Sequence, residues 1–299
     1  MKKQERYEKY IQQFVSIFSC PLCSASMRLE GSGSLVCAAK HTFDLAKQGY
    51  VNFMTRPVKS KYDKELFEAR KRVVDSALFE PLHKVISELI CSEEKGLKQR
   101  LKERTLIILD AGCGEGSHLF RIKNKLTAHF RTEVTGVGID LAKEGVSIAA
   151  KSYAGMIWCV ADLAHSPFKG DTFDVILNIL SPANYAEFNR LLKKDDGMII
   201  KVIPGSDYLK ELREVLYPEA AGKNYSNQRI TERFKTGFGK IEKYRVSEIV
   251  SLKQSLIPSL FRMTPLSWPV LERKIIDFDA IEIPAVSIDL DILVGRKEK

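Results

Sequence analysis

The sequence predicts an α/β fold, in which a Rossmann-like, mainly parallel sheet carries helices on both faces and follows a small N-terminal zinc-binding module. From Thr105 onward, short apolar runs alternate with amphipathic segments, as in proteins whose strands are buried between helices. Near the N-terminus, four potential metal ligands gather in a segment too small to build a core of its own. We therefore predict an N-terminal helix and zinc module at 1–60, a helical connection at 61–103 and a sheet domain at 104–299.

Composition limits the class of protein and its partners. The chain has 299 residues with 44% hydrophobic content, enough for a sizeable core, and a formal net charge of +9. The positive charge favours a polyanionic partner, although solvated lysines alone explain many basic proteins. No stretch is apolar for long enough to cross a bilayer, and the charged N-terminus is typical of an amphipathic helix instead of a secretory signal. We therefore expect no membrane contact, a cytoplasmic location and reduced cysteines.

The predicted metal site lies in the first segment. Cys20 and Cys23 place two thiols across a tight turn, and Cys37 with His41 supplies a second pair. Four such ligands complete one tetrahedral zinc site, which is structural because no position is left for water or substrate. Metal binding would supply most of the stability of so small a module.

Basic and aromatic side chains are interleaved around these ligands. This composition can meet phosphates and stack on unpaired bases, or the rings can form a small core beneath the metal. The residues concerned are Arg28, Lys40, Lys47 and Arg56 with Phe43, Tyr50 and Phe53.

The sheet domain begins after two helices, predicted from apolar positions at helical spacing around 66–74 and 82–89. Five strands are predicted at 105–110, 134–140, 156–160, 173–179 and 197–203. Crossover helices are predicted at 118–126, 142–153, 184–192 and 208–216. Two further strands, at 244–250 and 285–295, are expected to close one edge of the sheet, with a helical insertion containing MTPLSW between them.

A glycine-rich turn follows the first of these strands. The strand ends in Asp110, and Gly112, Gly114 and Gly116 follow in the sequence AGCGEG before an amphipathic helix. Glycines allow a sharp turn and close approach of the backbone to a ligand. Asp140 ends the second strand, where a carboxylate accepts hydrogen bonds from a ribose diol.

Two cofactor classes compete for this turn. A nicotinamide or flavin dinucleotide would place a pyrophosphate there, which Asp110 and Glu115 would repel. S-adenosylmethionine instead offers a cationic amino group and a cationic sulfonium, and we favour it. After the third strand, Asp162 can accept from the adenine amino group while Leu163 packs on the ring, although Asp162 can also be a helix cap.

The substrate side is predicted beyond the fourth strand. Asn178 begins the segment NILSP at the carboxyl edge of the sheet, where this architecture presents substrate-facing groups. A buried turn residue is an equally good interpretation of Asn178 alone. Cys113 and Cys159 are most simply small core residues.

Several motifs make the sequence resemble the bacterial 23S ribosomal RNA guanine-N1 methyltransferases that carry an N-terminal zinc module. They run in the family order from about Cys20 to the C-terminus: CPLC, CAAKHTFDLAKQGYVNF, EARKRVVDSALFEPL, LDAGCGEG, GIDLAKEGVSIAAK, CVADLAHSPF, NILSPANYAEFNRLLKKDDG and MTPLSW. The stretch before Ser19 extends beyond the family's usual start, and Asp162 stands where some relatives have a serine.

The resemblance implies a class I methyltransferase domain that moves a methyl group from S-adenosylmethionine to N1 of a guanine in a hairpin loop of large-subunit ribosomal RNA. It also implies a zinc module that helps to recognise the RNA, and it raises the possibility of a homodimer. Cys20, Cys23, Cys37 and His41 match the family's zinc ligands, and Asp110, Gly112, Gly114, Asp140 and Asp162 match its cofactor positions.

A chemical hypothesis follows for the substrate. Guanine N1 carries a proton at neutral pH and lies on the pairing edge, so the base must be unpaired or flipped out. We expect Asn178 to orient this base beside NILSP. The alternatives are a small-molecule methyltransferase and a zinc-dependent RNA-binding protein whose transferase domain is inactive.

Overall fold

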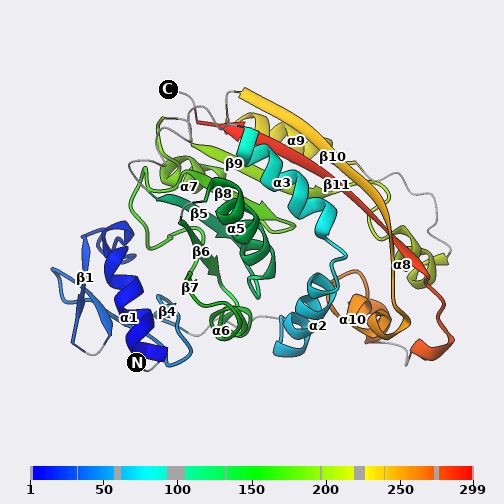
Figure 1. Cartoon of the computed structure of the whole chain (residues 1–299), viewed down its shortest axis with the longest axis horizontal. Helices are drawn as coiled ribbons and strands as arrows, with labels where there is room; N and C mark the ends of the chain where they lie inside the picture. Colours follow the sequence, from blue (N-terminus) through cyan, green and yellow to red (C-terminus); the bar gives the residue numbers. More distant parts are fainter. Residues whose placement is uncertain are drawn as a thin grey trace.

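A mixed eight-stranded sheet runs through the computed structural model (Figure 1). The structure describes residues 3–31, 33–56, 62–92, 105–131, 133–195, 197–218, 226–238, 240–272 and 276–297. The strands are β4 (Val51–Asn52), β5 (Leu106–Ala111), β6 (Val134–Asp140), β7 (Ile157–Val160), β8 (Val175–Ile179), β9 (Met198–Pro204), β10 (Lys240–Ser251) and β11 (Ala285–Arg296). All seven predicted strands are confirmed, and β4 is an addition.

The order of the strands creates a switch point at the centre of the sheet. Across the sheet they follow β10-β11-β9-β8-β5-β6-β7-β4, with β10 and β11 antiparallel to their neighbours and the other pairs parallel. The chain moves outward from β5 in one direction through β6 and β7, and in the other through β8 and β9. The carboxyl ends of β5 and β8 therefore flank the crevice where open α/β sheets bind ligands.

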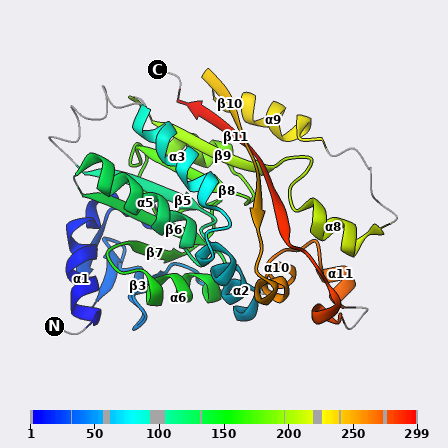
Figure 2. The ribbon, with the colours of Figure 1, turned by 45° about the vertical axis from the view of Figure 1, so that its right-hand side comes forward.

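Helices cover both faces of the sheet, as predicted (Figure 2). One face packs against α2 (Lys64–Asp75), α3 (Glu80–Ser92), α5 (Ser117–Phe130), α6 (Lys143–Ser152), α8 (Lys210–Leu216) and α10 (Ile257–Arg262). The other face packs against α7 (Tyr185–Leu191), α9 (Gln228–Lys235) and the N-terminal module. The predicted connection at 61–103 contains α2 and α3, and its residues 61 and 93–103 lie outside the described part of the chain.

The N-terminal module has a small sheet of its own. The predicted helix is α1 (Lys3–Gln13), and after η1 (Val15–Ile17) come the antiparallel strands β1 (Met27–Glu30), β2 (Ser34–Cys37) and β3 (Thr42–Asp44). The chain then enters the main sheet as β4, which pairs in parallel with β7 through Val51 and Asn52. The module is thus joined to the main sheet by backbone hydrogen bonds.

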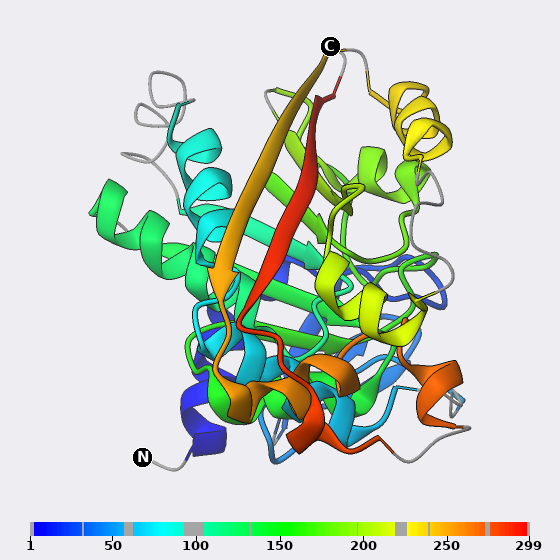
Figure 3. The same cartoon turned by 90° about the vertical axis from the view of Figure 1, so that its right-hand side faces the viewer.

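The last two strands form a long hairpin that reaches beyond the sheet (Figure 3). β11 pairs with β9 only from Leu290 onward, and its first residues continue toward α8 and the insertion. The insertion contains η3 (Gln254–Leu256), α10, α11 (Trp268–Leu271) and η4 (Phe278–Ala280), with MTPLSW spanning the turn between α10 and α11. Arg72 Nε donates to Ser259 Oγ at 2.9 Å, which fastens α10 to α2. Among the described residues, no helix has the length and apolar character needed to span a membrane.

We predict that Gly138→Ala destabilises the fold by about 1–3 kcal/mol because the added methyl group overpacks the core. A Cβ at Gly138 would lie 2.4 Å from the ring of Trp158, which is fully buried and has no room to move. Urea unfolding monitored by circular dichroism measures the change.

The matched control is Gly136→Ala in the same strand. Its added Cβ would meet the flexible ends of Met156 and Leu119 at 3.0 and 3.3 Å, so we expect a smaller loss of stability. Equal losses for the two variants would contradict this account of the packing.

Candidate active site and metal centre

The glycine-rich turn after β5 is held in a conformation that L side chains rarely adopt. Gly112 and Gly116 have φ angles of +86° and +80°. A side chain at Gly112 would collide with Ser181 Oγ, and one at Gly116 would lie 2.4 Å from the Trp158 ring. Both glycines are therefore needed to bring the turn against its neighbours.

Asp140 fastens this turn to the end of β6. Its Oδ2 accepts from the Gly114 backbone N–H and its Oδ1 from that of Ala142, both at 2.8 Å. Burial raises the pKa of this carboxyl, and the amide hydrogen bonds oppose the rise. Each carboxylate oxygen keeps a second lone pair, so the half-buried group can still accept a hydrogen bond from a ribose hydroxyl.

Two carboxyl groups are buried in the turn with unused hydrogen-bonding capacity. Asp110 is 2% exposed and Glu115 1%, and in the described part of the chain Asp110 Oδ1 and Glu115 Oε1 have no hydrogen-bond partner. Burial raises the pKa of both groups, and the charges of Glu115 and Asp140 raise that of Asp110 further. Such a site fits the cationic amino and sulfonium groups of S-adenosylmethionine and opposes a pyrophosphate.

Helix α2 covers the same turn, a role that the sequence analysis did not foresee. A Cβ at Gly114 would meet the Phe67 ring at 3.2 Å and the Arg70 guanidinium at 3.3 Å. Arg70 lies 5.6 Å from the centre of the Phe67 ring and donates to the Met263 carbonyl at 3.3 Å. Its charge lowers the pKa of Glu115 against the larger effect of burial. The available signal was an arginine one helical turn after a phenylalanine.

The predicted adenine side follows β7. Asp162 is exposed, and its Oδ1 accepts from the Ala164 N–H at 2.8 Å, so this carboxylate closes a turn and does not cap a helix. Leu163 is half-buried against the core that includes the N-terminal module. Leu141, directly after Asp140, is 40% exposed and was missed by the sequence analysis. The sequence signal that could have identified Leu141 is an apolar residue directly after the acidic residue that ends a strand.

Asn178 is the first residue of the NILSP segment and is fully buried. Its Nδ2 donates to the Ala111 and Pro182 carbonyls at 2.7 and 3.0 Å, and its Oδ1 accepts from Lys201 Nζ at 2.6 Å. Lys201 Nζ also donates to the Ser181 carbonyl, and burial lowers the pKa of this amine to about 8. The amide of Asn178 thus ties β8 to the end of β5 and fixes the loop above it.

The NILSP loop itself is strained and partly exposed. Leu180 has a φ of +50° and is 37% exposed, which is unusual for a large apolar residue. Its N–H donates to the Val202 carbonyl at 3.1 Å, so neighbouring strands hold this conformation. The next residue, Ser181, lies against Gly112 of the glycine-rich turn.

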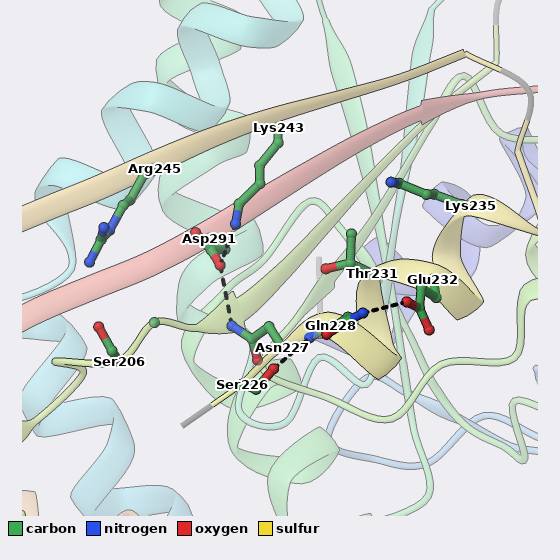
Figure 4. A pocket seen from close by; sticks show the side chains of 11 residues that line it. Ser206, Ser226, Asn227, Gln228, Thr231, Glu232, Lys235, Lys243, Arg245 and Asp291 are labelled. Atoms are coloured by element: carbon green, nitrogen blue, oxygen red, sulfur yellow. Dashed lines mark hydrogen bonds and ion pairs between the residues drawn. The ribbon is translucent and has the colours of Figure 1, made fainter. Parts of the chain in front are cut away.

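A polar pocket of about 500 Å³ lies past the carboxyl end of β9 (Figure 4). Lys243 pairs with the buried Asp291 at 2.9 Å, and Asn227 Nδ2 donates to the same carboxylate at 3.2 Å. No sequence pattern marks this pocket, because its lining comes from distant segments. The lining residues are Gly205, Ser206, Ser226, Asn227, Gln228, Thr231, Glu232, Lys235, Lys243, Arg245 and Asp291.

The four predicted zinc ligands converge in the N-terminal module. The ligand atoms of Cys20, Cys23, Cys37 and His41 all lie within 4.8 Å of one another. The sulfurs of Cys23 and Cys37 are 3.7 Å apart, close to the roughly 3.8 Å that two sulfurs at about 2.3 Å from a tetrahedral zinc would span. His41 Nδ1 lies 3.4 Å from the sulfurs of Cys20 and Cys37. The donor set and its spacing fit a structural zinc ion.

Residues 18–64 match the family described as "RlmA, N-terminal", and residues 108–195 match the family described as "Methyltransferase domain". A Bacillus subtilis protein named "Putative 23S rRNA (guanine-N(1)-)-methyltransferase YxjB" is 44% identical over 286 residues, covering 94% of this chain and 98% of the relative. The "23S rRNA (guanine(748)-N(1))-methyltransferase" of Streptomyces fradiae is 27% identical, covering 93% and 96%. The solved plantazolicin methyltransferase BpumL with SAH is 16% identical, with a TM-score of 0.41 over 79% of this chain and 95% of that chain.

We predict that Asp110→Asn weakens S-adenosylmethionine binding by roughly tenfold or more, because a buried charge that meets a cation is lost. A bound cation favours the ionised carboxylate, so this affinity is fully present above the raised pKa of Asp110 and is lost as the pH falls through it. Calorimetric titration across a pH series measures both effects.

Asp171→Asn is the control for this prediction. Asp171 pairs with Lys297 on the surface and has a φ of +53°, which asparagine tolerates. An Asp110→Asn protein with wild-type affinity and an unchanged pH profile would show that Asp110 does not meet the cofactor's cation.

Proposed function

The chain belongs to the family of 23S rRNA (guanine-N1-)-methyltransferases, and we propose that it moves a methyl group from S-adenosylmethionine to N1 of one guanine in a hairpin loop of 23S rRNA. The observation that carries this proposal is the pair of buried, partly unpartnered carboxyl groups, Asp110 and Glu115, at the sheet's switch point. These carboxyl groups suit a cationic methyl donor and disfavour a cofactor that bears phosphate. The domain division 1–60, 61–103 and 104–299 is proposed with it.

The residues at the carboxyl ends of β5, β6 and β7 would hold the cofactor. When bound, S-adenosylmethionine supplies the electrophilic methyl group. Asp110, Glu115 and the glycine-rich turn would receive its amino-acid end, and Asp140 would accept from the ribose hydroxyls. Asp162 and Leu163 follow β7 beside Asp140, since the Ala161 N–H donates to the Asp140 carbonyl at 3.0 Å. They would receive the adenine.

The ends of β8 and β9 would receive the guanine. Because N1 lies on the pairing edge, the base must leave any duplex before it reaches the methyl group. Leu180 offers an exposed apolar surface for a base at this edge. Asn178 is a positioning residue in this proposal, because its hydrogen bonds hold the loop that bears Leu180. Accurate placement of N1 in line with the methyl group would supply much of the acceleration.

The polar pocket beyond β9 would receive RNA backbone next to the target base. Lys243 and Arg245 are about half exposed, while their partners Asp291 and Asp289 are buried, so the cations are fixed at the surface. Lys235 on α9 is exposed at the same pocket. Fixed cations beside the substrate edge suit phosphate contacts. Action in the cytoplasm remains a prediction from the sequence, and assembly as a homodimer remains a prediction from the family resemblance.

The deciding experiment incubates the purified protein with radiolabelled S-adenosylmethionine and separate pools of ribosomal RNA, tRNA and metabolites. We expect label in 23S rRNA alone, on N1 of a guanine in digests analysed by mass spectrometry. Label in the metabolite pool would identify a small-molecule methyltransferase. Retention of RNA without any label would identify a binding protein with an inactive transferase domain.

We predict that Asn178→Ala lowers the turnover rate on the RNA hairpin roughly 10-fold to 100-fold, because the NILSP loop loses its support and the base is misplaced. S-adenosylhomocysteine affinity should stay close to that of the wild type. Single-turnover kinetics and calorimetry measure the two quantities.

Asn189→Ala is the matched control, since Asn189 Nδ2 also holds a backbone carbonyl, that of Gly237, at 2.7 Å away from the loop. We expect wild-type turnover for this variant. Unchanged turnover in Asn178→Ala would count against any role of Asn178 on the substrate side.

We predict that Lys235→Ala weakens binding of the RNA hairpin and reduces the slope of log affinity against log salt concentration by about one, as expected when one phosphate contact is lost. Fluorescence anisotropy across a salt series measures the slope. Lys194→Ala, at the amino-end edge of β9, is the control and should leave the slope unchanged. The same slope for Lys235→Ala and the wild type would exclude this phosphate contact.

A further inference from the structure

We propose that the zinc module also acts on the cofactor side of the reaction: it holds the adenine-facing segment 160–169, so that zinc and S-adenosylmethionine strengthen each other's binding. This inference rests on the cofactor position proposed above. It assigns the module a role in the methyltransferase domain that is separate from RNA recognition.

The module forms backbone hydrogen bonds with this segment at both of the segment's ends. At the first end, β4 pairs with β7, and the Phe53 N–H donates to the Val160 carbonyl at 2.8 Å. At the second end, the Ser19 N–H donates to the Pro167 carbonyl at 3.0 Å, and the Lys169 N–H donates to the Ile17 carbonyl at 2.8 Å. Asp162 and Leu163 lie between these two anchor points.

A cluster of aromatic rings joins the two anchor points inside the module. The rings of Phe18 and Phe53 have their centres 5.8 Å apart, and Phe18 also lies 5.7 Å from Phe168 of the segment. Phe43 packs on Phe53 at 5.1 Å. All four rings are buried, so the cluster is a core shared by the module and the sheet domain. It also settles the role of Phe43 and Phe53, which are not available for stacking on RNA bases.

The metal ligands sit next to this cluster in the chain. Cys20 directly follows Ser19, and His41 directly precedes β3, which contains Phe43. Two of the ligands therefore lie within two residues of Phe18 and Phe43, in the segments that position these rings. Loss of zinc would free these two segments from one another, because the metal links them through its ligands.

The sheet domain contributes contacts of its own to both ends of the segment. Arg190 Nη1 donates to the Phe168 carbonyl at 2.9 Å, and Ser166 Oγ donates to Glu187, both from α7. Near Asp162, the Ala161 N–H donates to the Asp140 carbonyl of β6 at 3.0 Å, and the Phe53 N–H of the module donates to the Val160 carbonyl at 2.8 Å, so both parts of the protein hold this end. Loss of the module's contacts should therefore increase the mobility of the adenine-facing part. Cofactor binding should then become weaker but persist.

Thermodynamic linkage makes this coupling testable from either direction. If zinc raises cofactor affinity by some factor, the cofactor must raise zinc affinity by the same factor. We expect S-adenosylhomocysteine to bind about 5-fold or more tightly to the zinc-loaded protein than to the zinc-depleted protein. Calorimetry on the full chain measures this affinity, and a chromophoric chelator measures the zinc affinity with and without S-adenosylhomocysteine.

The variant Phe53→Leu tests the packing between the module and the segment without removing a zinc ligand. We expect it to retain zinc, to bind S-adenosylhomocysteine more weakly, and to show faster hydrogen exchange in residues 160–169. Phe234→Leu is the matched control, because Phe234 is equally buried in a ring cluster with Tyr185 and Phe238 on α9's side of the sheet. It should leave S-adenosylhomocysteine affinity unchanged.

The outcomes separate the two proposals. A zinc-loaded wild-type protein that fails to bind S-adenosylhomocysteine would overturn the cofactor proposal and the coupling with it. Equal affinity with and without zinc, together with wild-type affinity in Phe53→Leu, would overturn the coupling alone. If the zinc-depleted protein aggregates, the S-adenosylhomocysteine affinity of zinc-loaded Phe53→Leu decides whether the coupling exists. The fold and the zinc content of this variant are measured separately.

Discussion

Two buried carboxyl groups with unpartnered oxygens, in the turn after β5, are the constraint on which the proposed cofactor site depends. Asp110 and Glu115 are buried with oxygens that the described chain leaves unpaired, at a free-energy cost that a cationic ligand would remove. Arg70 stands nearby on α2 and offsets part of the charge without forming a hydrogen bond to either carboxylate. The site is thus prepared for a cation while it remains foldable without one.

The N-terminal module is better understood as part of the sheet domain than as an attached recognition unit. It contributes β4 to the main sheet, and Tyr7 of α1 donates to the Trp158 carbonyl at 3.4 Å. A module this small gains stability from zinc and from the rings that it shares with the larger core. The free-energy cost of docking the module is therefore offset by the burial of apolar side chains from both parts of the protein.

The strands and their crossover helices were predictable because each has a strong local signature. Runs such as those of β5 and β6 are apolar for their whole length, as parallel strands buried on both faces require. β4 escaped prediction because two residues carry no periodic pattern, and only pairing with β7 defines it as a strand. The metal site was predictable because its ligands are close in sequence, whereas the pocket beyond β9 was not, because α9, β10 and β11 assemble it.

The direction in which a side chain points was the second feature that could not be predicted from the sequence. The NILSP segment predicts a substrate-facing edge, but whether Asn178 faces a ligand or the interior depends on Lys201, which lies on the neighbouring strand. Both residues are on the face of the sheet that packs against α7 and α9, where a buried amine and a buried amide would each be costly alone. Together they satisfy one another and the carbonyls of Ala111, Ser181 and Pro182. A buried polar network of this kind restricts the backbone to one arrangement, which is the requirement for a loop that must place an unpaired base against a methyl group.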